Sequence, residues 1–271
     1  MTYNKLLEET SSKFAKHFGF AHTVAAYAPG RIEVLGNHTD YNEGFVLSAA
    51  IDLGTFFLAA PAEGKTCRVV AGDLNEEASF ELDTLKAGKG SKNWSNYIKG
   101  VLAGLQEKEN IGKGFNGLFL GNIPVGSGLS SSAALEVSTG LALSSLYGIK
   151  LEPIELAKIG QAAEHEYVGA KCGLLDQITS LSGKKNELVM TDFRTLEAQT
   201  LPAGKDTCFV MCNTNVKHNL VESEYNERRA RCEEASAFFK SVLRDPVAAL
   251  RDVSWAEWQE FSPRMDATAA R

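Results

Sequence analysis

Residues 123–134 read IPVGSGLSSSAA, and this stretch decides the fold because it places a glycine–serine loop at the start of an expected helix. Gly126 and Gly128 can adopt positive φ and let the backbone approach a ligand closely. The serines that follow lead into small residues that suit a helix, so we expect one of them near its N-cap. The free N–H groups and the positive end of the helix dipole attract an anion. The stretch therefore predicts a phosphate site.

The loop differs from the Walker pattern, since Leu129 and Ser130 follow Gly128 where a Lys and a Ser or Thr are required. A different kind of phosphate loop is therefore predicted. A tight strand-to-helix turn whose serines only cap the helix would have the same residues. Both interpretations stay open from this segment alone.

A second segment, residues 28–44, reads APGRIEVLGNHTDYNEG and gathers polar groups between two apolar runs. Its cationic, amide, imidazole and carboxylate side chains can hold a polyhydroxylated molecule through paired donors and acceptors. A solvated polar loop is the alternative, and the segment alone favours neither. The side chains in question are Arg31, Asn37, His38 and Asp40.

The third segment, residues 163–177, reads AEHEYVGAKCGLLDQ and carries two carboxylates. Glu164 ends one helical pattern and Asp176 begins the next, so the two can converge across one turn. A buried carboxylate beside a cation such as Arg31 stays ionised and can be aimed at a hydroxyl. The alternatives are a surface position for Glu164 and, for Asp176, a carboxylate favoured by the helix dipole.

Composition narrows the class of protein. The 271 residues are 44% hydrophobic and 23% charged, which is ordinary for a globular protein of one large or two smaller domains. The first residues lack an apolar signal-peptide core, and no run of about 18 apolar residues occurs. We therefore expect a cytoplasmic protein without a membrane partner. A net charge of −6 without a basic stripe argues against nucleic acid as a partner.

The cysteines argue against two further classes. Five is an odd number and no C-x-x-C spacing occurs, so neither a disulfide framework nor a structural zinc site is expected. We expect buried or surface thiols.

The order of segments predicts an α+β fold. Helices are expected at residues 3–18, 93–107, 130–147, 153–169 and 174–182. Strands are expected at residues 23–35, 67–71, 77–82, 115–121 and 207–212, with two more within 44–60. A turn-rich stretch at 202–206 predicts a boundary between a domain of residues 1–203 and a second one of residues 204–271.

Together the segments resemble the GHMP kinase superfamily, and within it most closely the galactokinase family. Residues 30–41 resemble the galactokinase signature, and residues 124–134 resemble the superfamily's phosphate loop. Residues 173–177, 213–218 and 223–229 also resemble galactokinase segments. The resemblance implies a GHMP kinase fold, with an N-terminal domain like ribosomal protein S5 and an incomplete, ferredoxin-like C-terminal domain.

The resemblance also implies a reaction, the ATP-dependent phosphorylation of galactose at its C1 hydroxyl. Asp176 would act as the base or position that hydroxyl, and Arg31 would stabilise both Asp176 and the phosphoryl group in transfer. Ser132 and Glu164 match the family's Mg²⁺ ligands, and both offer the hard oxygens that this ion prefers. Expected partners are therefore a small-molecule sugar and ATP.

The remaining site residues follow from the same resemblance. Trp94 matches an aromatic residue that packs on adenine, although a core tryptophan is the alternative. The residues matching sugar contacts are Asn37, His38, Asp40, Gly173, Asp176 and Tyr225. The residues expected to hold the ATP phosphates are Pro124, Gly126, Ser127, Gly128, Leu129, Ser130, Ser131, Ser132 and Ala133.

One departure from the family pattern is Asn37, where galactokinases usually carry Glu. An amide is neutral and is both donor and acceptor, so the change would weaken galactose binding or alter specificity. Without the repulsion of a glutamate, a sugar with a C6 carboxylate such as galacturonate becomes a possible substrate.

A second departure concerns the end of the chain. Ser254 begins a capping box, and Ser262-Pro263 offers an N-cap and a first-turn proline for another helix over residues 263–271. That pattern stops without a C-cap glycine, and no third glycine-rich family motif is present. We therefore expect a truncated chain with exposed apolar faces and low turnover.

Two other functions remain open from the sequence. A kinase-like sensor would bind sugar and ATP without transfer. A kinase of another small alcohol, such as homoserine or mevalonate, would keep the phosphate loop but would not be expected to carry His38-Thr39-Asp40-Tyr41.

Overall fold

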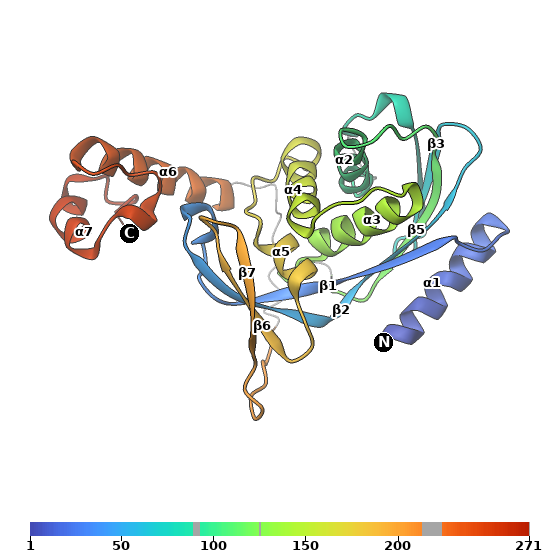
Figure 1. Cartoon of the computed structure of the whole chain (residues 1–271), viewed down its shortest axis with the longest axis horizontal. Coiled ribbons are helices and arrows are strands. Elements are labelled where there is room, and N and C mark those ends of the chain that lie inside the picture. The colour runs from blue at the N-terminus through green and yellow to red at the C-terminus, as the bar shows by residue number, and fades with distance from the viewer. Residues whose placement is uncertain (89–92, 125, 213–223, 271) are drawn as a thin grey trace.

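A computed structural model describes residues 1–88, 93–124, 126–212 and 224–270, in which helices cover a mixed sheet (Figure 1). The strands are β1 Val24–Leu35, β2 Phe45–Pro61, β3 Thr66–Ala71, β4 Glu76–Glu81, β5 Phe115–Gly121, β6 Glu187–Asp192 and β7 Glu197–Pro202. The helices are α1 Tyr3–Phe18, α2 Ser95–Gln106, α3 Ser131–Tyr147, α4 Pro153–Ala163, α5 Leu175–Ser182, α6 Glu224–Val242 and α7 Trp255–Phe261. A π-helical turn, Glu164–Val168, continues α4, and short 3₁₀ turns lie at Asp40–Asn42, Leu82–Thr84, Leu250–Asp252 and Ser262–Arg264.

The long strand β2 organises the sheet. The strand order is β4-β3-β5-β2-β6-β7, and β1 pairs with β2 as an additional neighbour. One half of β2 pairs with β5 from Thr55 to Pro61, and the other half pairs with β6 from Phe45 to Ser48. All pairings are antiparallel except that of β3 with β5. β2 therefore carries the chain from the loop at residues 36–44 into the centre of the fold.

The core lies on both faces of this sheet. Successive side chains of a strand point to opposite faces, so Phe57 and Ala59 pack under α2 and α3 while Phe56 and Leu58 pack against α1. Both faces are covered, which explains why residues 56–60 are apolar without a break. Figure 1 shows α2, α3, α4 and α5 on one side of the sheet and α1 apart from them.

Most predicted elements are confirmed, with shifts of one or two residues at their ends. The two strands expected within residues 44–60 form the single strand β2. The helix expected at 153–169 is α4 continued by the π-helical turn. β6, β7 and α6 were not predicted from the sequence.

The strand predicted at residues 207–212 is wrong. This segment is apolar, but it has no strand partner among the described residues, and its backbone therefore joins no ladder. Phe209, Val210 and Met211 are 49%, 81% and 49% exposed. The predicted boundary after residue 203 stays a prediction.

The second helix predicted at the end of the chain is also wrong. The capping box at Ser254 and Glu257 is present and begins α7. After Ser262–Arg264, however, Met265 is extended, and the side chain of Asp266 accepts hydrogen bonds from the N–H groups of Thr268 and Ala269. This local bonding competes with the helix that the proline favoured.

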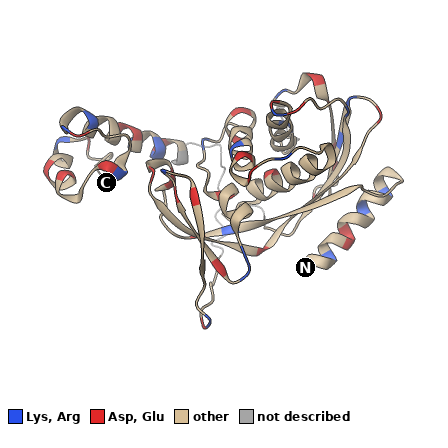
Figure 2. Ribbon diagram, in the orientation of Figure 1, with Lys and Arg blue, Asp and Glu red and all other residues tan. Residues whose placement is uncertain are grey.

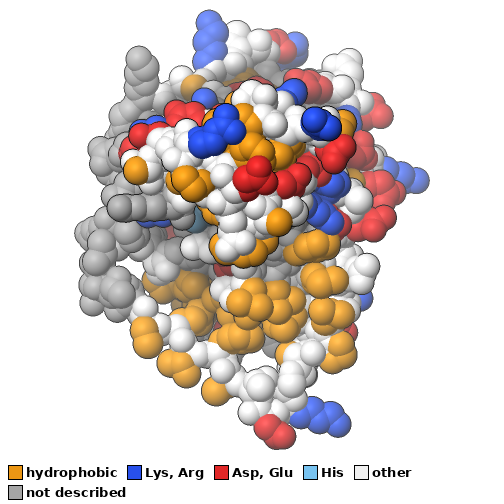
Figure 3. All heavy atoms as spheres, turned by 90° about the vertical axis from the view of Figure 1, so that its left-hand side faces the viewer, with side chains coloured by type: hydrophobic (Ala, Val, Ile, Leu, Met, Phe, Trp, Pro, Cys, Tyr) orange, Lys and Arg blue, Asp and Glu red, His pale blue; other side chains and the backbone are white. Residues whose placement is uncertain are grey.

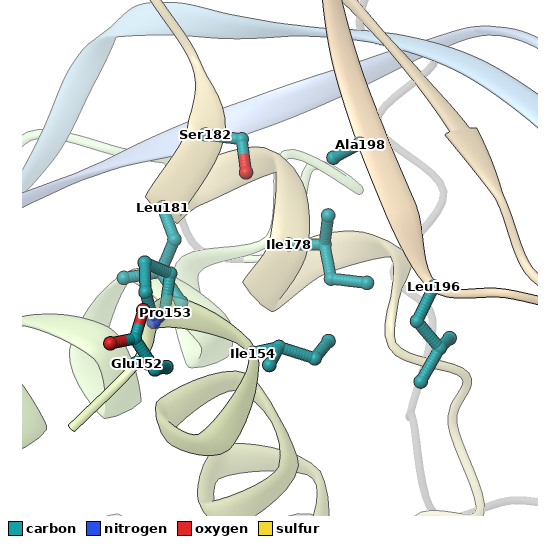
Figure 4. Close-up of a pocket in the computed structure, with 8 residues that line it drawn as sticks. All are labelled: Glu152, Pro153, Ile154, Ile178, Leu181, Ser182, Leu196 and Ala198. Carbon is teal, nitrogen blue, oxygen red and sulfur yellow. The ribbon is translucent and has the colours of Figure 1, made fainter.

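Charges and apolar side chains are unevenly spread over the surface. Figure 2 shows that α6, α7 and their connections carry many residues of both signs, whereas α3 and the central strands carry few. Figure 3 shows hydrophobic side chains gathered below the charged C-terminal helices. A separate pocket of about 290 Å³ lies between α4, α5 and the β6–β7 turn (Figure 4). Within the described ranges, no helix combines the length and apolarity needed to cross a membrane.

Candidate active site

The glycine–serine loop connects β5 to α3 and has the left-handed backbone that its sequence predicts. Gly126 and Gly128 have φ of 70° and 72°, and Ser130 is also left-handed with φ 59°. Ser130 is the N-cap residue of α3, but its hydroxyl makes no cap hydrogen bond. It donates instead to Asp176 Oδ2 at 2.6 Å. The first N–H groups of α3, which like those of any α-helix lack an intrahelical acceptor, therefore receive no cap from Ser130 and remain suited to an anion.

β1 holds this loop in place through the backbone of two residues. Arg31 N donates to Leu129 O at 3.2 Å, and Arg31 Nη1 donates to Gly128 O at 2.8 Å. A Cβ at position 30 would lie 2.5 Å from Leu129 O, so only glycine permits this approach. β1 and the glycine–serine loop are therefore in direct contact.

The Arg31–Asp176 pair expected from the sequence is present. Arg31 donates to Asp176 Oδ1 from Nε at 2.7 Å, and its Nη2 lies 2.6 Å from the same oxygen. The side chains are 15% and 26% exposed, which leaves the carboxylate reachable at the surface of the site. A guanidinium and a hydroxyl thus orient Asp176 from two sides.

Residues 36–44, which we call the signature loop, are fixed by internal hydrogen bonds. Tyr41 OH and His38 Nδ1 lie 2.6 Å apart, and Asn42 donates to the carbonyl of His38 at 2.8 Å. His38 is left-handed with φ 61°. The carboxylate of Asp40 lies against Gly173, while Asn37 is exposed. The loop and the start of α5 therefore meet.

The loop's titratable groups reflect their burial. Burial raises the pKa of Asp40, and the negative charge of Asp176 raises it further. Burial also raises the pKa of Glu33 on β1, against the lowering effect of Arg31. The pKa of His38 is lowered by burial and then by the positive charge of Arg228 on α6.

Glu164 and Ser132 lie together at the base of the site. Glu164 is 5% exposed, and burial raises its pKa, while hydrogen bonds involving Cys172, Ser132 and Gln177 lower it. The thiol of Cys172 donates to Glu164 Oε2. None of the ion pairs within the described residues includes Glu164. A buried carboxylate without a cation, beside a hydroxyl, fits a hard divalent ion such as Mg²⁺.

Among the residues that the structure describes, no larger metal cluster accompanies this pair. The described part of the chain contains no group of three or more His, Cys, Asp or Glu that could hold a metal. Mg²⁺ usually takes only one or two protein ligands and completes its shell with phosphate oxygens and water. The residue set therefore fits Mg²⁺ bound together with a nucleotide better than a site that holds the ion alone.

Trp94 is half-buried at the start of α2. Its ring contacts Phe119 at a centroid distance of 5.4 Å, and its N–H donates to Glu76 at 2.8 Å. The residue thus packs on the core and presents a partly exposed ring. Its contact with adenine stays a prediction.

Two contacts of the site could not be predicted from the sequence, and some predicted site residues lie outside the described part of the chain. The hydroxyl of Ser130 that orients Asp176 and the thiol of Cys172 at Glu164 join residues 46 and 8 positions apart, for which no helical or strand period gives a signal. The family segments at 213–218 and Ser223 lie outside the described residues. Tyr225 lies in α6, and its side chain is outside the described part.

Comparison with known proteins gives this geometry a family. The model of the GHMP kinases N terminal domain matches residues 96–184, and the galactokinase galactose-binding signature matches residues 12–61. The structure of Lactococcus lactis galactokinase complexed with galactose is 34% identical, with a TM-score of 0.86. That match covers 97% of this chain and 69% of the Lactococcus chain.

More distant structures share the fold alone. Mevalonate kinase of Methanococcus jannaschii is 23% identical with a TM-score of 0.55, covering 68% of this chain and 56% of that one. D-glycero-D-manno-heptose 1-phosphate kinase of Bacteriodes thetaiotaomicron is 20% identical with a TM-score of 0.55, covering 66% and 60%. The identity and coverage of the Lactococcus match, with both family models, show that the chain belongs to the galactokinase family of the GHMP kinases.

Proposed function

We propose that this chain carries the site of an ATP-dependent galactokinase, which transfers the γ-phosphoryl group of ATP to the C1 hydroxyl of galactose. The observation that carries the proposal is the placement of Arg31. One guanidinium contacts both the carboxylate of Asp176 and the carbonyl of Gly128 in the phosphate loop. A single side chain thereby links the group that handles the hydroxyl to the loop that holds the phosphates.

In the proposed reaction Asp176 accepts the proton of the C1 hydroxyl or orients it. The sugar oxygen forms a bond to the γ-phosphorus, and the bond from that phosphorus to the bridging oxygen breaks, leaving ADP. Arg31 offsets negative charge beside the transferring group, and the N–H groups at the start of α3 hold phosphate oxygens. Positioning and charge neutralisation supply most of the catalysis that this chemistry needs.

Ser132 and Glu164 would hold Mg²⁺. The ion supplies charge neutralisation for the phosphate oxygens when it is bound. Without a cation, Glu164 is a buried carboxylate that raises the free energy of the folded chain. We therefore assign its burial to ion binding rather than to stability.

The sugar would contact the signature loop and the start of α5. His38, Asp40 and Gly173 offer an imidazole, a carboxylate and backbone groups that can pair with hydroxyls. Tyr225 and Asn37 complete the proposed sugar contacts, and Trp94 is the proposed adenine contact.

The test is an ADP-release assay with Mg²⁺, ATP and galactose on the purified chain, with other hexoses as comparisons. Activity with galactose that disappears in Asp176→Asn supports the proposal. Calorimetry distinguishes the non-catalytic alternative, because a sensor would bind galactose and ATP without releasing ADP. Binding of neither ligand by the folded chain contradicts both functions.

A galacturonate kinase is the second candidate, and it rests on charge at the signature loop. Asn37 is neutral and exposed, and two cations of α6 reach this loop. Arg229 lies over the Tyr41 ring at 5.9 Å. The positive charge of Arg228 is the second cause of the lowered pKa of His38, and burial is the first. Both charges favour an anionic sugar.

Rates with galactose and galacturonate separate the two candidates, with Asn37→Glu as the matched variant. A carboxylate at position 37 would repel galacturonate, so the variant should lose galacturonate turnover and keep that with galactose. Efficient use of galactose with undetectable turnover of galacturonate in the unmodified chain excludes the second candidate.

A further inference from the structure

Glu136 is a carboxylic acid side chain in the interior of the protein. It lies on α3, one turn beyond the proposed phosphate site, and is 0% exposed. Its Oε2 accepts a hydrogen bond from Gln177 Nε2 at 2.9 Å, and Gln177 on α5 is also 0% exposed. No ion pair of the described residues includes Glu136. An ionised carboxylate in this position would be expensive.

Helix α4 packs closely against the Glu136–Gln177 pair. A Cβ at Gly160 of α4 would lie 3.0 Å from Glu136 Oε2 and 3.1 Å from Gln177 Cγ. Such contacts are tighter than ordinary van der Waals packing, so the absence of a side chain lets α4 close over the pair. No space is left on that side for a solvating group.

The hydrogen bonds of the pair do not balance if Glu136 is ionised. Gln177 has two N–H donors, and its amide contacts Glu136 as well as Glu164. The other oxygen of each side chain, Glu136 Oε1 and Gln177 Oε1, is buried without a hydrogen-bond partner. Each unpartnered acceptor in the interior costs free energy. A proton on Glu136 Oε1 turns that oxygen into a donor, for which Gln177 Oε1 is a buried acceptor without a partner.

We propose that Glu136 is protonated in the folded chain and forms a neutral acid–amide pair with Gln177 that locks α5 against α3. The Glu136 hydroxyl donates to Gln177 Oε1 while Gln177 Nε2 donates to Glu136 Oε2. Gln177 follows Asp176 directly, so the pair positions the carboxylate to which the proposed function assigns the C1 hydroxyl. The positioning role rests on the proposed function. The protonation of Glu136 is independent of it.

The electrostatic surroundings support a neutral acid. The groups that face Glu136 are Glu164 after α4, Asp176 on α5, Cys172 in the loop between them and Tyr97 on α2. All are acids, so none offers a positive charge. Burial raises the pKa of Glu136 well above its usual range, and the charges of Glu164 and Asp176 raise it further.

Equilibrium unfolding as a function of pH tests the proton without any ligand. A raised pKa in the folded chain means that its stabilising effect is complete below about 4.5 and is lost as pH rises towards the folded value. Glu136→Gln keeps an amide that can donate and accept in the same positions but cannot ionise. Between about pH 5 and 7, the folding equilibrium constant of the original chain should fall relative to this variant by up to about tenfold per pH unit.

Two controls keep the experiment decisive. Glu8→Gln on the exposed face of α1 should follow the original chain, and Glu136→Leu should be less stable than Glu136→Gln at every pH because it leaves the Gln177 amide unpaired. Infrared spectra at neutral pH provide a direct readout, in which the original chain shows a protonated carboxyl band that is lost in Glu136→Gln, while any band from another carboxyl is common to both proteins. Parallel pH curves for these two proteins, or no such band, would overturn the proposal. Since neither readout uses substrate, failure of the proposed function would appear separately, in the ADP-release assay.

Discussion

Two acidic regions of this molecule differ in the partners of their carboxylates. What we call the buried cluster consists of the buried Glu136 and Glu164 and the partly exposed Asp176. Among the described residues, its one ion pair is that between Asp176 and Arg31. The edge network lies where β6 ends and joins residues from three parts of the chain. Its members are Glu43, Asp192, Arg194, Arg251 and Asp252.

In the edge network nearly every charge has a partner. Arg194 bonds Glu43 at 2.8 Å and Asp252 at 2.6 Å, while Arg251 forks onto Asp192 and lies 4.2 Å over the Phe45 ring. These contacts hold the segment after α6 to the sheet. Because they are open to water, they add only modestly to the stability of the fold. In the buried cluster, Glu136 and Glu164 form no ion pair among the described residues, and an ionised carboxylate so placed costs stability. The comparison teaches that the edge network serves architecture, whereas Asp176 and Glu164 of the buried cluster are the carboxylates to which we assign the sugar hydroxyl and Mg²⁺.

The largest effect is expected from Asp176→Asn in the buried cluster. The amide keeps the shape of the side chain but cannot accept the proton of the sugar hydroxyl. Turnover should fall by about 10²- to 10⁴-fold, as measured by ADP release with galactose. ATP affinity by calorimetry serves as the control and should be unchanged. Activity within a few fold of the original chain would remove Asp176 from the reaction and weaken the contrast between the regions.

Glu164→Gln should have opposite effects with and without Mg²⁺. The raised pKa of Glu164 means that stability is lost as pH rises from about 4.5 through the folded value, so burial of this carboxyl destabilises the metal-free chain at higher pH. The variant should therefore gain about 1 to 3 kcal/mol in urea unfolding without Mg²⁺. Mg²⁺ added with ADP should stabilise the original chain and not the variant. Equal stabilisation of both proteins would contradict ion binding at this carboxylate.

Arg251→Ala probes the strongest member of the edge network. The substitution removes two bonds to Asp192, one to the carbonyl of Glu43 and the stacking on Phe45. Loss of the stacking alone should cost about 1 kcal/mol in urea unfolding. The exposed Arg244→Ala is the matched control. An unchanged midpoint would mean that the segment after α6 is held by other contacts.

Arg194→Ala should have the smallest effect, since its side chain is 39% exposed and its partners remain solvated. A small lowering of the urea midpoint at low salt should vanish at about 1 M salt, where exposed charges are screened. A loss that persists in high salt would show that the edge network resembles the buried cluster more than its exposure suggests.

The sequence predicted the elements whose signals are local. The glycine–serine loop and α3 could be predicted from the glycines, serines and small residues that follow one another in the sequence. The Arg31–Asp176 pair could be expected because a carboxylate buried at a helix start needs a nearby cation. β6 was missed because its place in the sheet is set by the distant residues Phe45–Ser48 of β2, and β7 joins the sheet only through β6. α6 was missed because its surface is polar almost all round, with Ala235 and Phe239 among its few buried residues.

Proton positions and long-range hydroxyl contacts were beyond the sequence for a different reason. The bond from Ser130 to Asp176 exists only because Ser130 leaves its capping role and adopts a left-handed backbone. The Glu136–Gln177 pair joins α3 to α5, and α4 approaches it closely at Gly160. Such features follow from packing between helices rather than from any period along the chain.

The contact between the glycine–serine loop and β1 also has a consequence for protein engineering. Gly30 and the backbone of Arg31 abut Leu129, so the loop's shape depends on a strand that comes about a hundred residues earlier in the chain. A designer who transplants residues 123–134 alone into another scaffold would leave behind the strand that holds the loop in its shape. The smallest transferable module comprises the loop, α3 and the segment of β1 around residue 30, brought together as one three-dimensional part.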